Sequence, residues 1–213
     1  MANILIIGAS KGIGLEAAEQ ALACGHSVRA FARSADRITL TDHKLEKLNG
    51  DALNKEDVTS ALKGIDAVIQ TLGIALGPEL LLGPVRLFSE ATWILVSAMQ
   101  AAGVKRLISI TGFGAGDSRA SIGFFQSIPF RLFLGRVYDD KDTQEFIIRR
   151  SNLDWVIVRP GILTKGARTG RYQVLQYDKS WRNGCISRAD VADFLIKQID
   201  DNTYLRNTPV LIY

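Results

Sequence analysis

Short apolar runs alternate along the chain with longer segments in which apolar residues recur every three or four positions. Residues 3–7 (NILII) are almost continuously apolar, which is typical of a parallel strand buried on both faces. Residues 12–23 place their apolar side chains on one face of a predicted helix that stops before Gly25. The pattern repeats, and predicts further strands at 27–32, 44–49, 66–71, 106–111, 155–158 and 210–213 and further helices at 55–62, 89–102, 138–150 and 187–199.

Two of these helices have marked beginnings. Ser89 is the predicted N-cap of helix 89–102, whose apolar residues, Trp93 among them, surround the axis and predict a buried element. Ser187 and Asp190 form a predicted capping box for helix 187–199, with Ile186 positioned to pack against Val191.

Strands that alternate with helices at this spacing predict an α/β fold of three layers, a doubly wound parallel sheet covered by helices on both faces. The chain has 213 residues, of which 47% are hydrophobic and 23% charged, values of a folded globular protein. We find no linker or internal repeat. We therefore expect a single domain over residues 1–213, with a small substrate region around 112–137 and 161–186.

Charge and cysteine content narrow the possible partners. Lys and Arg number 26 against 22 Asp and Glu, and the net charge of +4 is scattered, so we expect no nucleic-acid partner. We find neither a secretory signal nor an apolar run long enough to span a membrane, and expect a cytoplasmic monomer or homodimer that binds a small-molecule substrate. Cys24 and Cys185 lie at no metal-ligand spacing with His26 and His43, so we expect no metal, and both cysteines buried.

A glycine-rich turn, residues 8–14 (GASKGIG), joins the first strand to the first helix. Glycines there allow the backbone to approach a pyrophosphate, and the free N–H groups at the start of the helix face the phosphates. The strand before and the helix after distinguish this turn from a merely structural one. We expect a dinucleotide to contact Gly8, Ser10, Lys11, Gly12, Ile13 and Gly14.

The end of the second predicted strand bears on the choice of dinucleotide. A site that prefers NAD places an acidic residue about twenty positions beyond the glycines. Here that position is Arg33, followed by Ser34, and a guanidinium can pair with a 2′-phosphate. Lys11 could add a second cation. The sequence thus favours NADP(H) over NAD, the alternative being that Arg33 is an ordinary solvated surface residue.

The turn GASKGIG resembles the cofactor turn of the short-chain dehydrogenases/reductases. The stretch DKDTQEFIIRRSNLDWVIVRPGIL is similar to their atypical branch, which includes flavin/biliverdin reductase-like proteins and nitrogen metabolite repression regulators. The resemblance implies a Rossmann sheet of about seven strands. It also implies that further residues lie against the cofactor: Asp51 and Ala52, Leu72 and Gly73 near adenosine, and Pro160, Gly161 and Ile162 near the nicotinamide.

Catalysis is where the sequence departs from that family. The main branch uses a Tyr-x-x-x-Lys pair in which the lysine lowers the pKa of the tyrosine. Here Lys141 aligns with the family lysine, but Tyr138 is one residue too close and Val137 stands at the tyrosine position. We expect Lys141 to bind the nicotinamide ribose, and leave open whether Tyr138 donates a proton or only packs.

The end of the fifth predicted strand offers a hydroxyl. Ser109 and Thr111 share a face, and Thr111 lies nearer the edge where ligands bind, so it is our candidate active-site hydroxyl. The alternative is a threonine that only satisfies a backbone group. Residues 112–121 predict a flexible mouth, and the aromatic stretch 123–134 either an apolar wall for a planar substrate or a core or dimer surface.

These features favour an NADP-dependent oxidoreductase that transfers a hydride to a small planar acceptor such as a flavin, a quinone or a carbonyl compound. The alternative is an NADP(H)-sensing regulatory binding protein. A sugar-nucleotide epimerase is disfavoured, because only about fifty residues follow Gly161 to build a substrate domain.

Overall fold

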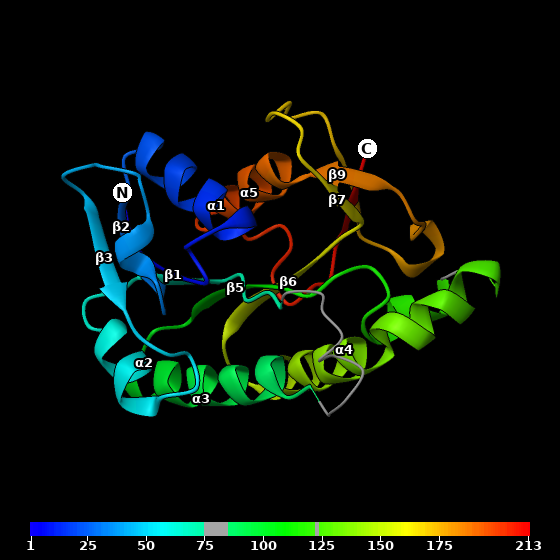
Figure 1. Cartoon of the computed structure of the whole chain (residues 1–213), viewed down its shortest axis with the longest axis horizontal. Helices are drawn as coiled ribbons and strands as arrows, with labels where there is room; N and C mark the ends of the chain where they lie inside the picture. Colours follow the sequence, from blue (N-terminus) through cyan, green and yellow to red (C-terminus); the bar gives the residue numbers. More distant parts are fainter. Residues whose placement is uncertain (75–84, 122–123) are drawn as a thin grey trace.

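An eight-stranded sheet separates two layers of helices (Figure 1). The computed structural model describes residues 1–74, 85–121 and 124–213, and for residues 119–121 and 124–134 only the course of the backbone. The helices are α1 (Gly12–Ala23), α2 (Lys55–Ala61), α3 (Leu87–Ala102), α4 (Phe124–Arg150) and α5 (Arg188–Lys197). The strands are β1 (Asn3–Ile7), β2 (Ser27–Ala32), β3 (Leu45–Asn49), β4 (Ala67–Gln70), β5 (Arg106–Ile110), β6 (Asp154–Pro160), β7 (Ile162–Thr164), β8 (Gln173–Leu175), β9 (Cys185–Ser187) and β10 (Val210–Ile212).

The strand order of the large sheet is β3-β2-β1-β4-β5-β6-β10-β8. Its pairs are parallel except for β8, which runs antiparallel to β10. The order reverses between β1 and β4, which is the switch point where doubly wound sheets bind ligands. The predicted Rossmann fold is confirmed, and β7 and β9 form a separate parallel pair.

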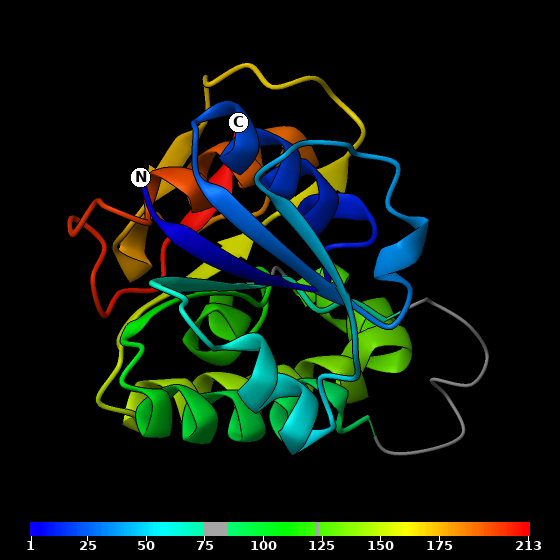
Figure 2. The ribbon, with the colours of Figure 1, turned by 90° about the vertical axis from the view of Figure 1, so that its left-hand side faces the viewer.

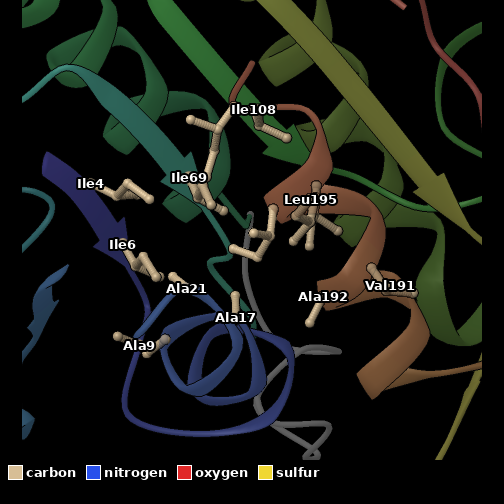
Figure 3. Close-up of a cluster of buried hydrophobic side chains, with 14 of the residues drawn as sticks. Ile4, Ile6, Ala9, Ala17, Ala21, Ile69, Ile108, Val191, Ala192 and Leu195 are labelled. Carbon is tan, nitrogen blue, oxygen red and sulfur yellow. The ribbon is translucent and has the colours of Figure 1, made fainter. Parts of the chain in front are cut away.

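The two helical layers bury different faces of this sheet (Figure 2). Helices α1 and α5 cover one face, where small residues such as Ala17 and Ala21 let them approach the strands closely (Figure 3). Helices α2, α3 and α4 cover the other face, with Leu95 and Met99 fully buried against the strands. Since each strand places successive side chains on opposite faces, Ile4 and Ile6 belong to the first core and Leu5 and Ile7 to the second.

The predicted elements are confirmed to within a few residues, with two kinds of exception. Strands β7, β8 and β9 have three residues each, too few for a periodic pattern to be recognised. Helix α4 begins at Phe124, well before the predicted start at residue 138.

Two predicted caps differ in detail because residues distant in the sequence take part. The backbone N–H groups of Phe88 and Ser89 donate to Asp140 of α4 at 2.8 and 3.3 Å, so Asp140, rather than the predicted Ser89, satisfies the start of α3. Ser187 does cap α5, accepting from the Asp190 N–H at 3.0 Å. The Asp190 carboxylate, however, accepts from Thr169, Gly170 and Tyr213, so the capping box is only half formed.

Three burial predictions are wrong. Cys24 and Cys185 are both exposed, Cys24 as the C-cap of α1 and Cys185 as the first residue of β9. Trp93 is 62% exposed, on the side of α3 that faces away from the sheet. In the described parts of the chain, no helix is long and apolar enough to cross a membrane.

Candidate functional site

Most of the predicted site residues follow the carboxyl ends of parallel strands, at one edge of the sheet. Ile7 of β1 pairs with Phe31 of β2 and Gln70 of β4, and Ile110 of β5 pairs with Val158 of β6. The glycine turn, Thr111 and Pro160 therefore lie on the same side of the fold, as do the residues after β2, β3 and β4. Open α/β sheets bind their ligands at this edge.

The glycine turn is tightly built against β4. Gly8 has φ of +88°, and its N–H donates to the Phe31 carbonyl at 2.9 Å. A Cβ on Gly14 would lie 2.3 Å from the Gly8 carbonyl oxygen and 2.5 Å from Thr71 Oγ1. Gly14 is thus required by the close approach of helix, turn and strand, whatever the turn binds.

The beginning of α1 is open. Lys11 is the N-cap, makes no side-chain capping hydrogen bond, and is exposed, and the first turn contains no acidic residue. Gly12 has φ of +61°, and a Cβ there would meet nothing within 4 Å. Ser10 is half-buried and Ile13 packs against the core. Free N–H groups with no competing carboxylate are what an anion such as a pyrophosphate requires.

Two arginines follow β2 at the same edge. Arg33 is exposed, and half-buried Ser34 is the N-cap of a short 3₁₀ helix, Ala35–Arg37, that ends with exposed Arg37. This turn is fixed to β3 by the Asp36 N–H, which donates to Asn49 Oδ1 at 3.2 Å. Arg37, a second exposed cation that follows β2, was not singled out from the sequence.

The residues after β3 and β4 form parts of the same edge. Asp51 is half-buried; its N–H donates to Asp57 Oδ2 at 2.9 Å and its Oδ1 accepts from the Leu53 N–H at 3.0 Å. Ala52 is buried beside it. Leu72 is half-buried against both α3 and α4, and Gly73 is exposed with open space where a Cβ would be.

At the end of β6 the chain leaves the large sheet and enters the small β7–β9 sheet. Pro160 is buried, and Gly161 donates its N–H to the Leu211 carbonyl at 3.0 Å. A Cβ on Gly161 would lie 2.3 Å from the Gly184 carbonyl oxygen. Ile162 is 63% exposed, so its apolar side chain faces solvent at this edge.

Lys141 and Thr111, two of the predicted site residues, are in contact. The Lys141 ammonium donates to the Thr111 carbonyl at 2.8 Å and lies 4.2 Å from the centre of the Phe88 ring. Burial lowers the pKa of Lys141 to about 8, although the nearby charges of Glu145 and Asp140 act to raise it. Lys141 is therefore a buried cation at the end of β5 that loses its proton within reach of physiological pH.

Tyr138 lies in a mostly apolar environment. Its ring packs with Phe88 and Val137, and its hydroxyl lies 2.9 Å from where a Cβ of Gly112 would be. Burial raises the pKa of Tyr138. A Tyr/Lys pair requires a lowered tyrosine pKa, so the environment of Tyr138 works against that role.

A buried ion pair, which the sequence analysis missed, lies behind Thr111. Glu145 and Arg159 are 2% and 0% exposed, and Arg159 Nε and Nη2 approach the two carboxylate oxygens at 2.9 and 2.5 Å. Thr111 Oγ1 lies 2.8 Å from Glu145 Oε1. Burial acts to lower the pKa of Arg159, but the hydrogen bonds and charges of Glu145 and Asp117 raise it above its ordinary value. An arginine inside the apolar strand WVIVRP was the available hint, because a buried charge needs a partner.

The loop after β5 is packed rather than an open, flexible mouth. Its residues from Gly112 to Ala115 are buried, and Gly116 donates its N–H to Asp142 of α4 at 2.6 Å. Asp117 accepts from Arg149 at 2.8 Å and from Arg159 at 3.0 Å. Carboxylates and arginines of α4 and β6 thus hold this loop in place. The aromatic stretch at 123–134 lies outside the residues whose side chains are described.

Comparison with known proteins supports the interpretation of this edge. Residues 8–202 match the model of a family described as NAD(P)H-binding. A yeast protein, UPF0659 protein YMR090W of Saccharomyces cerevisiae, is 30% identical over 148 residues, which are 67% of this chain and 60% of the relative. Photosystem II assembly factor Ycf39 of Synechocystis is 23% identical over 215 residues, 97% of this chain and 61% of the relative. The chain therefore spans about three fifths of these curated relatives.

A solved structure gives a similar match over nearly its whole length. ChuY of Escherichia coli O157:H7, described as an anaerobillin reductase, superimposes with a TM-score of 0.82 at 28% identity, covering 99% of this chain and 96% of that one. The matched range includes the glycine turn, Thr111, Lys141, the buried ion pair and the Arg-Pro-Gly at the end of β6. The chain therefore belongs to the NAD(P)H-binding family, in the atypical branch of the short-chain dehydrogenases/reductases that its sequence resembles.

Proposed function

We propose that this protein is an NADP-dependent oxidoreductase that transfers a hydride to a small planar acceptor. The observation that carries the proposal is the open start of α1, next to the switch point of the sheet, with exposed Lys11 and Arg33 at the same edge. Bound there, the dinucleotide would supply the hydride, and the chain would supply orientation and charge.

The preference for NADP rests on the two cations. Arg33 follows the strand end that accepts the adenosine ribose in this fold, and a guanidinium pairs well with a 2′-phosphate. Lys11 precedes Gly12 at the same edge, and exposed Arg37 is one 3₁₀ turn beyond Arg33. Under this proposal the other contacts come from the glycine turn, Ser34, Asp51, Ala52, Leu72, Gly73 and the Pro160–Ile162 corner.

The type of acceptor follows from what surrounds Lys141. Reduction of a carbonyl needs a proton donor aimed at the developing oxyanion, and the raised pKa of Tyr138 argues against it in that role. Flavins, quinones and similar conjugated acceptors take their proton from solvent, so positioning by Lys141 and Thr111 is sufficient. The description of ChuY as an anaerobillin reductase supports a conjugated acceptor of this kind.

An NADP(H)-sensing binding protein is the second candidate. It is supported by the relative described as a photosystem II assembly factor, a role other than catalysis, and by the absence of a tyrosine at position 137. Steady-state NADPH oxidation separates the two: turnover with flavins, quinones or aldehydes indicates an enzyme, and tight nucleotide binding without turnover on any of them indicates a sensor.

Calorimetric titration tests the cofactor assignment. We expect NADPH to bind about tenfold or more tightly than NADH, and Arg33→Ala to remove most of that preference, since a charge-assisted contact is worth about 1.5–3 kcal/mol. Arg150→Ala is the matched control, because Arg150 is an exposed arginine at the end of α4, where β6 begins rather than ends. Equal affinities for both nucleotides in the wild type would contradict the NADP assignment.

A further inference from the structure

We propose that Glu145 and Arg159 are positioning residues that make Thr111 a hydrogen-bond acceptor, so that Thr111 holds an N–H or O–H donor of the bound nucleotide and does not protonate the substrate. This inference rests on the proposed function, because it assigns a task to Thr111 within the same site.

Arg159 fixes the charge of Glu145. Its two carboxylate oxygens face Arg159 Nε and Nη2 at 2.9 and 2.5 Å, the parallel two-bond geometry of an arginine–carboxylate pair. Arginine does not lose its proton in proteins, and all its nitrogens are donors. Glu145 is therefore ionised and can only accept hydrogen bonds.

The charge of Glu145 fixes the direction of its hydrogen bond with Thr111. Its Oγ1 lies 2.8 Å from Glu145 Oε1, and since the carboxylate has no proton to give, the hydroxyl must be the donor. A threonine hydroxyl has a single proton, and this proton is used in the hydrogen bond to Glu145. What remains on Oγ1 for any other group is a lone pair.

Hydrogen bonds and burial hold Thr111 beside Glu145. Its backbone N–H donates to the Val158 carbonyl at 3.0 Å, and its carbonyl accepts from the Lys141 ammonium at 2.8 Å. The residue is 5% exposed, so a hydroxyl turned away from Glu145 would lose this hydrogen bond with little water to replace it. Because of the ion pair, the Thr111 hydroxyl can act toward a ligand only as a hydrogen-bond acceptor.

Lys141 and Thr111 therefore have complementary roles at the end of β5. Lys141 offers donors and Thr111 offers an acceptor, so together they can hold two different polar groups of one ligand. A hydride acceptor that needs a protein proton in the transition state would find none at Thr111, which restricts the acceptors to those protonated from solvent.

The test compares NADPH binding by calorimetry in Thr111→Val and Thr111→Ser. Serine keeps the hydroxyl and its bond to Glu145, whereas valine keeps the shape and loses the acceptor. We expect valine to raise the Kd for NADPH about threefold to tenfold, and serine to leave it within about twofold of the wild type. Thermal melting establishes that both variants fold.

Glu145→Gln tests the positioning role. Glu145 Oε2 accepts from Arg159 Nη2, whereas Oε1 accepts from both Arg159 Nε and Thr111 Oγ1. When the amide oxygen stays on Nη2, the N–H₂ group takes the place of Oε1 and can accept from neither, so the Thr111 hydroxyl accepts from Gln and turns its own proton outward. We expect a rise in Kd similar to that of Thr111→Val, and no further rise in the double variant. Asp117→Asn is the control, since Asp117 touches Arg159 Nη2 at 3.0 Å and forms no described contact with Thr111.

The outcomes separate this inference from the function on which it rests. Wild-type protein that fails to bind NADPH overturns the proposed function, and the inference with it. Wild-type binding with an unchanged Kd in Thr111→Val overturns the inference alone. If Glu145→Gln does not fold, the valine and serine variants still decide whether Thr111 is an acceptor.

Discussion

The glycine turn at residues 8–14 and the polar cluster of Thr111, Glu145 and Arg159 lie at the same edge of the sheet but are built on opposite principles. The turn consists of neighbours in the sequence and depends on side chains being absent, as the 2.3 Å approach at Gly14 demonstrates. The cluster joins residues that are 34 and 14 positions apart, and depends on buried charges being paired.

This difference shows why one region can be identified from a motif and the other cannot. Spacing alone specifies a turn, because backbone geometry over a few residues is local. A buried ion pair is specified only when α4, β5 and β6 have packed, since neither partner is stable inside the protein without the other. Substitutions in the two regions should therefore affect stability and activity differently.

The largest effect is expected at the turn. Gly14→Val introduces a side chain where even a Cβ collides with the Gly8 carbonyl, so we expect it to destabilise the fold by about 3 kcal/mol or more, the upper end of overpacking costs. Gly12→Ala is the matched variant: open space surrounds it and only the positive φ costs energy, about 1–2 kcal/mol. Urea denaturation measures both. A Gly14→Val variant as stable as the wild type would mean that the turn is looser than described.

The next largest effect is expected at Lys141, which lies beside the cluster and should make the free energy of unfolding depend on pH. The unfolded chain keeps this proton up to its ordinary pKa of 10.5, whereas burial lowers the pKa in the folded state to about 8. Between these values the unfolded state binds more protons, so the free energy of unfolding should rise with pH, by about 2–3 kcal/mol.

Lys141→Met provides the comparison, because methionine fills the same apolar space without a titrating group. Urea denaturation of both proteins from about pH 7 to pH 10 should show the wild type gaining stability relative to the variant. Parallel pH profiles would indicate that Lys141 is better solvated than its position beneath Phe88 implies.

The smallest effect is expected for Tyr138→Phe. If Tyr138 only packs against Phe88 and Val137, the variant should keep kcat/KM within about threefold, whereas loss of a true general acid costs about 10²- to 10⁴-fold. The measurement uses whichever acceptor supports NADPH oxidation. A large loss confined to this variant would restore ordinary Tyr/Lys carbonyl reduction and would make the end of β5 a proton-donating site.

Particular residues show how far sequence reasoning reached. The bounds of β1 and α1 match the prediction, because a continuous apolar run and a helix stopped by Gly25 are local patterns. Lys141 and Thr111 were each singled out, from the family offset and from strand alternation, but the contact between the Lys141 ammonium and the Thr111 carbonyl was not predicted. The cap on α3 was not, since the carboxylate that satisfies Phe88 belongs to Asp140, 52 residues away.

The sequence by itself determined the alternation of the longer strands and helices, the glycine turn and the cation at position 33, because each depends on neighbouring residues or on a fixed period. It did not predict the three-residue strands β7, β8 and β9. Only the tertiary structure decided that Arg159 is buried and paired, that the loop after β5 is held by α4, and that Cys24, Cys185 and Trp93 face solvent. These outcomes depend on which surfaces meet when the layers pack, and desolvation then determines which charges must pair.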